Sequence, residues 1–115
     1  MVKRDMNLLL IKAFPELKKQ IEEETDWQEG LETGSHVVYG DVFSPYIKKM
    51  KDEQNLAELE RIFDFIESLC NSGDSYCEEV VVQSVLEGLI FDDISYSFYD
   101  TYMGEATKEL VKNII

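Results

Sequence analysis

The single histidine of the chain, His36, follows the hydroxyl-bearing Ser35, and this is where nucleophilic chemistry could be sought. In serine hydrolases an imidazole takes the proton of the hydroxyl, while a third group orients the imidazole. Catalytic groups usually meet through the fold rather than as sequence neighbours, and no orienting group or oxyanion donor can be located here. We therefore expect no turnover. A small hydrolase that uses His36 and acidic residues is the alternative.

Cys70 and Cys77 are the two cysteines, and their spacing is not that of a redox-active CxxC pair. Two cysteines and one histidine do not match the usual ligand sets of zinc. The sequence contains no glycine-rich phosphate loop, no HExxH motif and no GxSxG motif. It therefore predicts no catalytic residues, no metal, no cofactor and two reduced thiols.

Apolar residues recur at helical spacing along most of the chain, so the elements that carry its polar groups should be helices. The clearest apolar stripe follows the helix-capping residue Asn55. It consists of Leu56, Leu59, Ile62, Phe63, Ile66, Leu69 and Cys70. The prediction is one all-α domain over residues 1–115, an irregular bundle of about five to six helices joined by short turns. The pair 55–70 and 75–91 could form a solenoid-like antiparallel unit.

The segment 37–43 is the most ambiguous, because its valines and tyrosine favour a strand. Ser44 and Pro45 resemble a helix N-cap followed by proline at the first helical position. Either a separate helical turn precedes Ser44, or one continuous helix is kinked at Pro45. We favour helix, because no partner strand is evident. Beside Gly40, Asp41 is expected to be a turn or capping carboxylate rather than a functional one.

The charge balance is strongly acidic, with 24 acids against 11 bases and a net charge of −13. Residues 52–100 hold thirteen acids and one base, Arg61, which gives 1 − 13 = −12 for this region alone. Such a field repels nucleic acid and anionic lipid and attracts basic proteins. A merely solvated helix face would interleave lysine with glutamate. Acidity that only maintains solubility is the alternative.

Acidic and aromatic residues mix between residues 91 and 102. If Ile94, Phe98 and Tyr102 face the core, the tyrosines between them are exposed, where they would be typical contact residues. The alternative is that these tyrosines also belong to the core. The expected partner-binding residues are Asp92, Asp93, Tyr96, Tyr99 and Asp100, with Glu23, Asp26 and Trp27 as a second patch.

Several segments together resemble a family of small helical bacterial proteins, some similar to immunity proteins of contact-dependent growth-inhibition and polymorphic-toxin systems. They are Phe14-Pro15-Glu16-Leu17, Val37-Val38-Tyr39-Gly40-Asp41-Val42, Ser44-Pro45-Tyr46, Arg61-Ile62-Phe63-Asp64-Phe65-Ile66-Glu67 and Val85-Leu86-Glu87. The resemblance implies a protein that neutralises one cognate toxin domain, frequently a basic nuclease, by covering its active site. Contact residues in such pairs differ from pair to pair, so none can be carried over by position.

The resulting expectation is a monomer that forms a one-to-one complex with a cationic toxin domain, a ribonuclease rather than a deoxyribonuclease. No direct contact with nucleic acid or membrane is expected. Lys12 interrupts the short apolar run at residues 8–11, and no stretch approaches the length of a membrane span, so we expect a cytoplasmic protein. A small acidic binding module or a DNA mimic outside a toxin system is the alternative.

Overall fold

The computed structural model describes residues 1–26, 28–91 and 96–114, and all regular structure in these ranges is helical, as the sequence predicts. The α-helices are α1 (Lys3–Ala13), α2 (Lys18–Thr25), α3 (Ser35–Val38), α4 (Ser44–Asp52), α5 (Leu56–Cys70), α6 (Ser75–Val81), α7 (Glu87–Phe91), α8 (Tyr96–Asp100) and α9 (Glu105–Lys112). Two 3-10 turns, η1 (Pro15–Leu17) and η2 (Gly30–Glu32), and two π turns, η3 (Tyr39–Phe43) and η4 (Val82–Leu86), complete the order.

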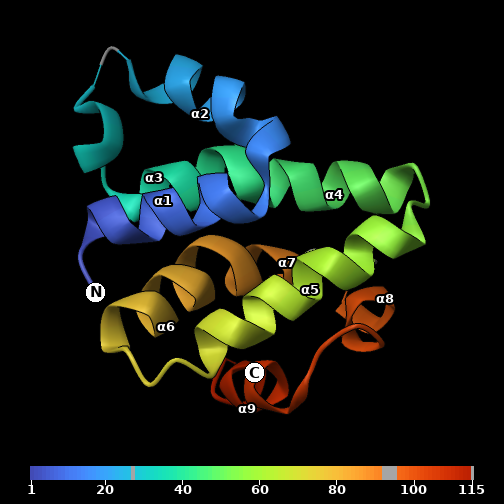
Figure 1. Ribbon diagram of the computed structural model, residues 1–115. Helices are drawn as coiled ribbons and strands as arrows, with labels where there is room; N and C mark the ends of the chain where they lie inside the picture. Colours follow the sequence, from blue (N-terminus) through green and yellow to red (C-terminus); the bar gives the residue numbers. More distant parts are fainter. Residues whose placement is uncertain (27, 92–95, 115) are drawn as a thin grey trace.

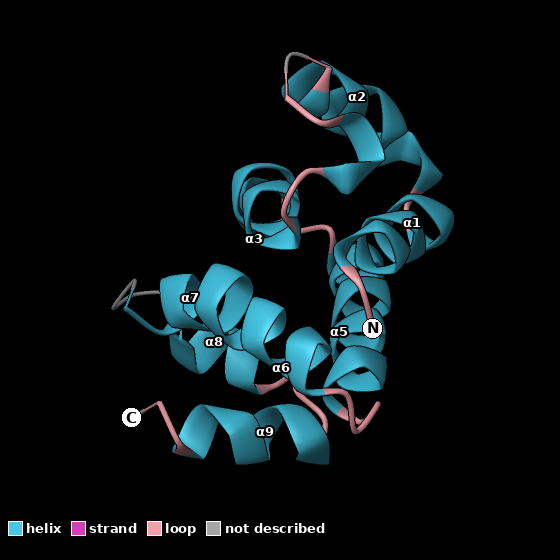
Figure 2. Ribbon diagram, turned by 90° about the vertical axis from the view of Figure 1, so that its left-hand side faces the viewer, coloured by secondary structure: helices cyan, strands magenta, loops and turns pink. Residues whose placement is uncertain are grey.

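The two halves of the chain stack on each other, with α1 to α4 above and α5 to α9 below in Figure 1. Helix α5 descends from the end of α4, and α6–η4–α7 returns beside it in the opposite direction. Seen from the side, α1 and α5 form one layer, while α3 and the α6–α7 helix form the other (Figure 2). The apolar core lies between these layers. The antiparallel pairing expected for 55–70 and 75–91 is confirmed.

Aromatic rings join the two halves at the centre of the molecule. The centroid of the Phe14 ring lies 5.3 Å from that of Phe43 and 5.4 Å from that of Phe65. These rings come from the end of α1, from η3 and from α5, so one cluster holds three elements together. Phe14 and Phe43 are completely buried. Each such ring stabilises the fold by about 1.5–3 kcal/mol.

One continuous helix runs from α3 through η3 into α4, so of the two alternatives for residues 37–43 the continuous helix is correct. The expected N-cap at Ser44 is wrong, because Ser44 has helical backbone angles (φ −60°, ψ −47°) and donates its N–H to Tyr39 O. This bond spans one residue more than an α-helical bond. Pro45 offers no N–H to the helix, and a π turn directly before it accommodates that missing donor.

The two π turns pack against each other where their helices cross. Small residues meet at this crossing: a Cβ atom on Gly40 would lie 3.8 Å from Cβ of Ser84, and one on Gly88 would lie 3.9 Å from Oγ of Ser44, both ordinary van der Waals distances. The crossing fixes the α3–η3–α4 helix relative to the lower half of the molecule. It thereby also fixes the outer face of that helix, which forms one wall of the groove described below.

A buried polar residue, Asn7, ties the connection between α2 and α3 to α1. Its amide donates to the backbone oxygens of Leu31, at 3.0 Å, and Thr33, at 2.8 Å. Its side-chain oxygen accepts a hydrogen bond from Ser35 Oγ at 2.9 Å. These bonds satisfy polar groups that would otherwise be costly to bury. The hydroxyl of Ser35 therefore has a structural partner.

Candidate functional site

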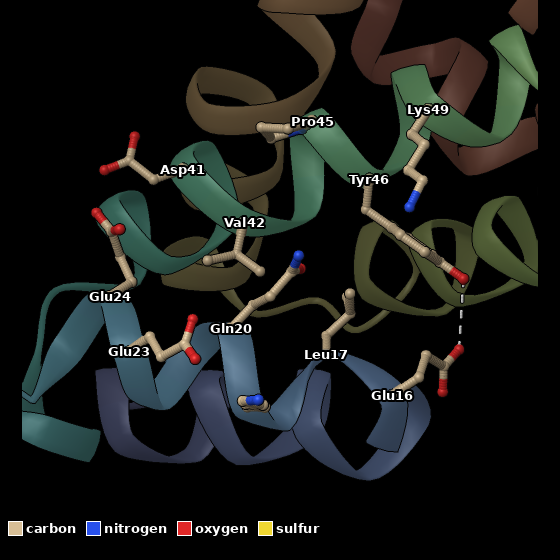
Figure 3. A pocket seen from close by; sticks show the side chains of 11 residues that line it. Glu16, Leu17, Gln20, Glu23, Glu24, Asp41, Val42, Pro45, Tyr46 and Lys49 are labelled. Carbon is tan, nitrogen blue, oxygen red and sulfur yellow. Dashed lines mark hydrogen bonds between the residues drawn. The ribbon is translucent and has the colours of Figure 1, made fainter.

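A groove of about 620 Å³ separates α2 and η1 from the η3–α4 segment (Figure 3). Its apolar lining is contributed by Leu17, Val42 and Pro45. Its polar lining includes four carboxylates, Glu16, Glu23, Glu24 and Asp41, and two lysines, Lys19 and Lys49. A cavity with an apolar part and a few convergent charged groups has the composition expected of a binding site.

Each wall owes its charges to the amphipathicity of its helix. Leu17 of η1 and Ile21 of α2 are buried, which leaves Glu23 exposed and Glu24 half-buried on the groove side. In η3, Phe43 is completely buried in the core and Val42 is buried at the base of the groove, which leaves Asp41 exposed at the rim. The carboxylates of Glu23, Glu24 and Asp41 gather at one end of the groove in Figure 3.

Those three carboxylates have no side-chain hydrogen bond or ion pair within the part of the chain that the structure describes. Among the described residues, no group of three acidic, histidine or cysteine side chains is close enough to hold a metal ion. Unpaired carboxylates near one another repel, and this repulsion is relieved by a cation. Because no three of them could hold one metal ion, they suit separate cationic groups, such as arginine or lysine side chains, each bound by its own carboxylate.

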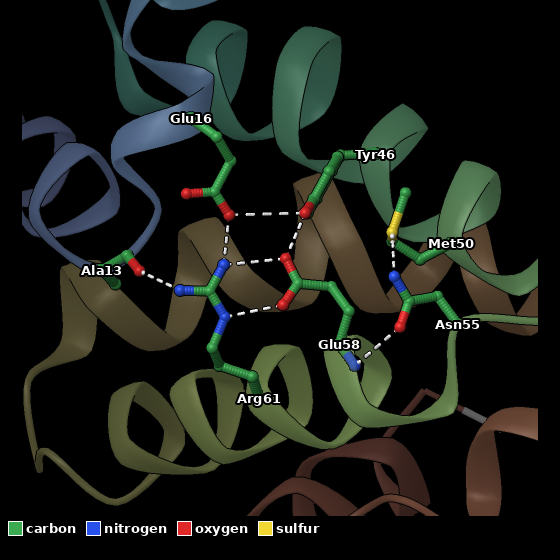
Figure 4. Close-up of polar contacts among 7 residues, drawn as sticks. All are labelled: Ala13, Glu16, Tyr46, Met50, Asn55, Glu58 and Arg61. Atoms are coloured by element: carbon green, nitrogen blue, oxygen red, sulfur yellow. Dashed lines mark hydrogen bonds and ion pairs between the residues drawn. The ribbon is translucent and has the colours of Figure 1, made fainter.

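At the other end of the groove the charges are already paired, in a network centred on Arg61 of α5 (Figure 4). Nε and Nη2 of Arg61 each donate to the Glu58 carboxylate at 2.7 Å, and Nη1 donates to Ala13 O at 2.9 Å. Nη2 also donates to Glu16. The guanidinium carbon lies 4.4 Å from the centroid of the Phe14 ring, which adds a cation–π contact.

The network also holds Tyr46, whose hydroxyl donates to Glu58 and lies 3.4 Å from Glu16. The hydrogen bonds from Arg61 lower the pKa of Glu58 to about 2, although burial acts in the opposite direction. Burial and the bond to Glu58 raise the pKa of Tyr46. Around neutral pH, Tyr46 is therefore neutral while Glu58 and Arg61 are charged and paired. The uncompensated charge of the groove lies at its other end.

Of the second predicted patch, Glu23 lines the groove, while Asp26 is exposed just beyond α2 and does not line it. Trp27 lies outside the described residues. Sequence reasoning missed Glu24, and it assigned Asp41 to a turn or cap because glycine and aspartate favour turns. Asp41 instead lies within a π turn of a continuous helix. The sequence did contain one indication that Asp41 lies on an outer helix face: it directly precedes two apolar residues, Val42 and Phe43, that are buried.

The first predicted patch is wrong at Tyr99, which is 0% exposed and cannot contact a partner. Its ring centroid lies 5.7 Å from that of Phe63 on α5, so the alternative placement in the core is correct for this tyrosine. Asp100 is half-buried. Asp92, Asp93 and the side chain of Tyr96 lie outside what the structure describes. Tyr99 was misplaced because the inner face of α8 was assigned to Phe98, whereas Phe98 is half-buried and Tyr99 is the side chain that packs on Phe63 in the core.

His36 does not form a pair with its neighbour Ser35. Its Nδ1 atom lies 2.9 Å from Oγ of Ser84, on the opposite π turn, and its ring packs edge-on to Tyr76 with centroids 6.4 Å apart. No carboxylate is hydrogen-bonded to His36 among the described residues. The contact joins the two crossing helices, and it is the one histidine–hydroxyl arrangement that the fold creates in the described ranges.

Fold and groove together define a small all-helical domain with a groove on one face that is lined by four carboxylates and two lysines. The chain belongs to the family described as a domain of unknown function (DUF7674), whose model matches residues 7–115. Neither a curated protein nor a solved structure matches the chain. Within the described residues, no helix combines the length and apolarity needed to cross a membrane.

Proposed function

We propose that the chain is a binding protein that receives a cationic segment of a partner protein in the groove between α2 and η3–α4. The observation that carries the proposal is the set of three unpaired carboxylates, Glu23, Glu24 and Asp41, beside an apolar lining. Arginine or lysine side chains of the partner would pair with these carboxylates, and their methylene groups would cover the apolar lining.

The partner class that fits best is a cationic toxin domain, so that the chain would act as an immunity protein in the cytoplasm. A nuclease must hold phosphates and therefore lines its cleft with lysine and arginine. A net charge of −13 favours rapid encounter with such a surface and disfavours direct contact with nucleic acid. The resemblance to small helical immunity-like proteins supports the same class. We retain a ribonuclease as the first choice of toxin.

The experiment pairs the chain with the toxin domain encoded beside its gene and measures both affinity and protection from growth arrest. The triple variant Glu23→Lys, Glu24→Lys and Asp41→Lys should bind at least about tenfold more weakly, because each reversal places like charges together. A matched control, Glu60→Lys, Asp64→Lys and Glu79→Lys, changes the net charge equally through exposed residues of α5 and α6. This control should bind far more tightly than the groove variant.

Charge reversal at Asp92 and Asp93 tests the other predicted surface in the same assay. Loss of binding there, with the groove variant unchanged, would move the interface away from the groove. If all three variants weakened binding equally and only slightly, the groove would not be the interface, and the acidity of the chain would serve solubility alone. If the neighbouring reading frames encode no toxin domain, a DNA mimic is favoured, and the test partner becomes a nucleic-acid-binding protein.

A small hydrolase is the second candidate, and the contact between His36 Nδ1 and Ser84 Oγ at 2.9 Å is the observation in its favour. An imidazole at this distance can take the hydroxyl proton and activate the oxygen as a nucleophile. A fluorophosphonate probe separates the two candidates. Labelling of Ser84 in the wild-type protein that disappears in His36→Ala would support the hydrolase. Absence of labelling in the folded wild-type protein would exclude it.

A further inference from the structure

Exposed apolar side chains gather on α1 and on the two residues that precede it. Five large apolar side chains are exposed among the described residues, and three of them, Met1, Val2 and Leu8, lie on or next to this helix. Leu8 is 40% exposed and borders a hollow of about 360 Å³. Met1, Asp5, Leu8, Leu9 and Lys12 line that hollow. Apolar side chains gathered in this way are typical of an interface.

The stripe formed by Asp5, Leu8, Leu9 and Lys12 follows the i, i+3, i+4, i+7 spacing of one helix face. Met6 and Leu10, on the opposite face, are completely buried in the core. Asp5, Leu8 and Lys12 are exposed, while Leu9 is half-buried and also packs against the core, so the stripe forms the outer side of α1. Helix α1 itself lies at one side of the molecule in Figure 2, where it is seen close to end-on.

The pKa of the N-terminal ammonium group is raised by its hydrogen bond to Asp74 and, to a smaller extent, by the charge of Asp5. Beyond this effect, the charged side chains of the stripe are available to a partner. Lys3 and Arg4 of the same helix form ion pairs with Glu29, at 3.8 Å, and Glu32, at 3.5 Å. No side-chain hydrogen bond or ion pair engages Asp5 or Lys12 within the described residues. One negative and one positive group thus flank the two leucines at equal sequence distance from the midpoint between Leu8 and Leu9.

This symmetry makes the stripe complementary to itself in an antiparallel arrangement. Asp5 and Lys12 each lie 3.5 residues from the midpoint, which is about 5 Å along the helix axis. When a second α1 packs antiparallel about that midpoint, Asp5 faces Lys12 of the other copy, Lys12 faces Asp5, and the leucines meet between them. A two-fold axis creates both ion pairs at once, as in other isologous interfaces.

We propose that α1 is a self-association surface, through which two copies of the chain pair antiparallel across Leu8 and Leu9 with reciprocal Asp5–Lys12 ion pairs. The hollow beside this interface and the acidic groove have no lining residue in common. It is an interaction additional to the proposed function and does not depend on it.

Sedimentation equilibrium over a wide concentration range tests the pairing. The wild-type protein should form a reversible dimer. Asp5→Lys and Lys12→Asp should each weaken it by at least about tenfold, because either change places like charges opposite each other twice. The double variant Asp5→Lys/Lys12→Asp should regain the dimer, since the reciprocal pairs re-form with their signs exchanged. An equimolar mixture of the two single variants should associate where neither does alone.

Matched controls separate the interface from net charge and from folding. Glu60→Lys and Lys48→Asp make the same charge changes at exposed positions on α5 and α4, and they should leave the dimer intact. Circular dichroism checks that each variant stays helical. The proposal is overturned by a wild-type protein that stays monomeric throughout, by single variants that dimerise as well as wild type, or by a double variant that fails to recover.

Discussion

The Glu67 carboxylate occupies the space that a side chain on Gly104 would need: a Cβ atom there would lie 2.4 Å from Cδ of Glu67. From this position the carboxylate accepts hydrogen bonds from the backbone N–H groups of Ala106, at 3.0 Å, and Thr107, at 2.9 Å, and from the Thr107 hydroxyl at 2.8 Å. Although burial acts in the opposite direction, these bonds lower the pKa of Glu67. A residue of α5 thus caps the first turn of α9.

Gly104→Ala should therefore destabilise the fold by about 1–2 kcal/mol, because the added methyl group displaces the carboxylate from the N–H groups of α9. The free energy of unfolding, measured by urea denaturation, reports the loss. The decisive comparison is the same substitution in a Glu67→Ala background, where it should cost only a few tenths of a kcal/mol. Equal losses in both backgrounds would show that Gly104 acts independently of Glu67.

Glu58→Gln should destabilise the protein by about 1 kcal/mol at pH 7, a value kept small because Arg61 is 45% exposed and water screens the pair. The pKa of Glu58 is lowered from 4.5 to about 2 in the folded state. The ion pair thus stabilises the fold fully above the unfolded-state pKa and progressively less as pH falls toward 2. Denaturation at several pH values should show the difference from wild type narrowing over that window.

The control for this measurement is Glu60→Gln, which removes an exposed carboxylate of the same helix. Glu60 makes no ion pair among the described residues, and its replacement should change stability by less than about 0.5 kcal/mol at pH 7. A difference between wild type and Glu58→Gln that stays constant from pH 7 to pH 2 would contradict the role assigned to Arg61.

Tyr99→Ala should lower the free energy of unfolding by about 3 kcal/mol or more, because it removes a completely buried ring that packs on Phe63. Thermal or chemical denaturation checks this expectation. Thr101→Ala, an exposed change two residues further on, should stay within about 0.5 kcal/mol of wild type. If Tyr99→Ala left the free energy of unfolding unchanged, α8 would pack differently and Tyr99 would belong to the surface.

Both thiols should react slowly with an aromatic disulfide reagent in the native protein. Burial raises the pKa of Cys70 to about 11, and it raises the pKa of Cys77 as well. Thiolate, the reactive form, is therefore scarce at neutral pH, and burial also blocks the access of the reagent to both sulfur atoms. Unfolding in urea should accelerate labelling at least about a hundredfold. Rapid labelling of either cysteine in the native state would indicate local opening of α5 or α6.

Helix α5 illustrates what periodicity can predict. The apolar stripe that follows Asn55 is buried from Leu59 to Cys70, and the Asn55 side chain accepts from the Glu58 N–H as a cap should. Leu56 is the exception, at 53% exposed, because it starts the helix beyond the edge of the core. Periodicity identifies the inner face of a helix, but it does not tell how far along that face the neighbouring elements extend.

The charge pattern was harder to interpret, because the partners of several acids lie far away in sequence. Glu58 binds Arg61 of its own helix, but Glu67 caps α9, and Asp74 forms an ion pair with the N-terminal ammonium group of Met1. Part of the acidity of residues 52–100 is thus structural. The unpaired carboxylates of the groove come instead from residues 23–41, and only tertiary packing brings α2 and η3 together.

The π turn at η3 holds one residue more than an α-helical path through the same positions would. Deleting one residue from it would restore α-helical bonding and leave the helix on either side in place, whereas a deletion within α4 would rotate everything after it by about 100° around the helix axis. A relative that is shorter by one residue at η3 would therefore keep Ile47 in the core and Tyr46 and Lys49 in the groove wall. It would differ only in the local bulge that carries Asp41, so this turn is the place in the helix where a change of chain length is compatible with the same architecture.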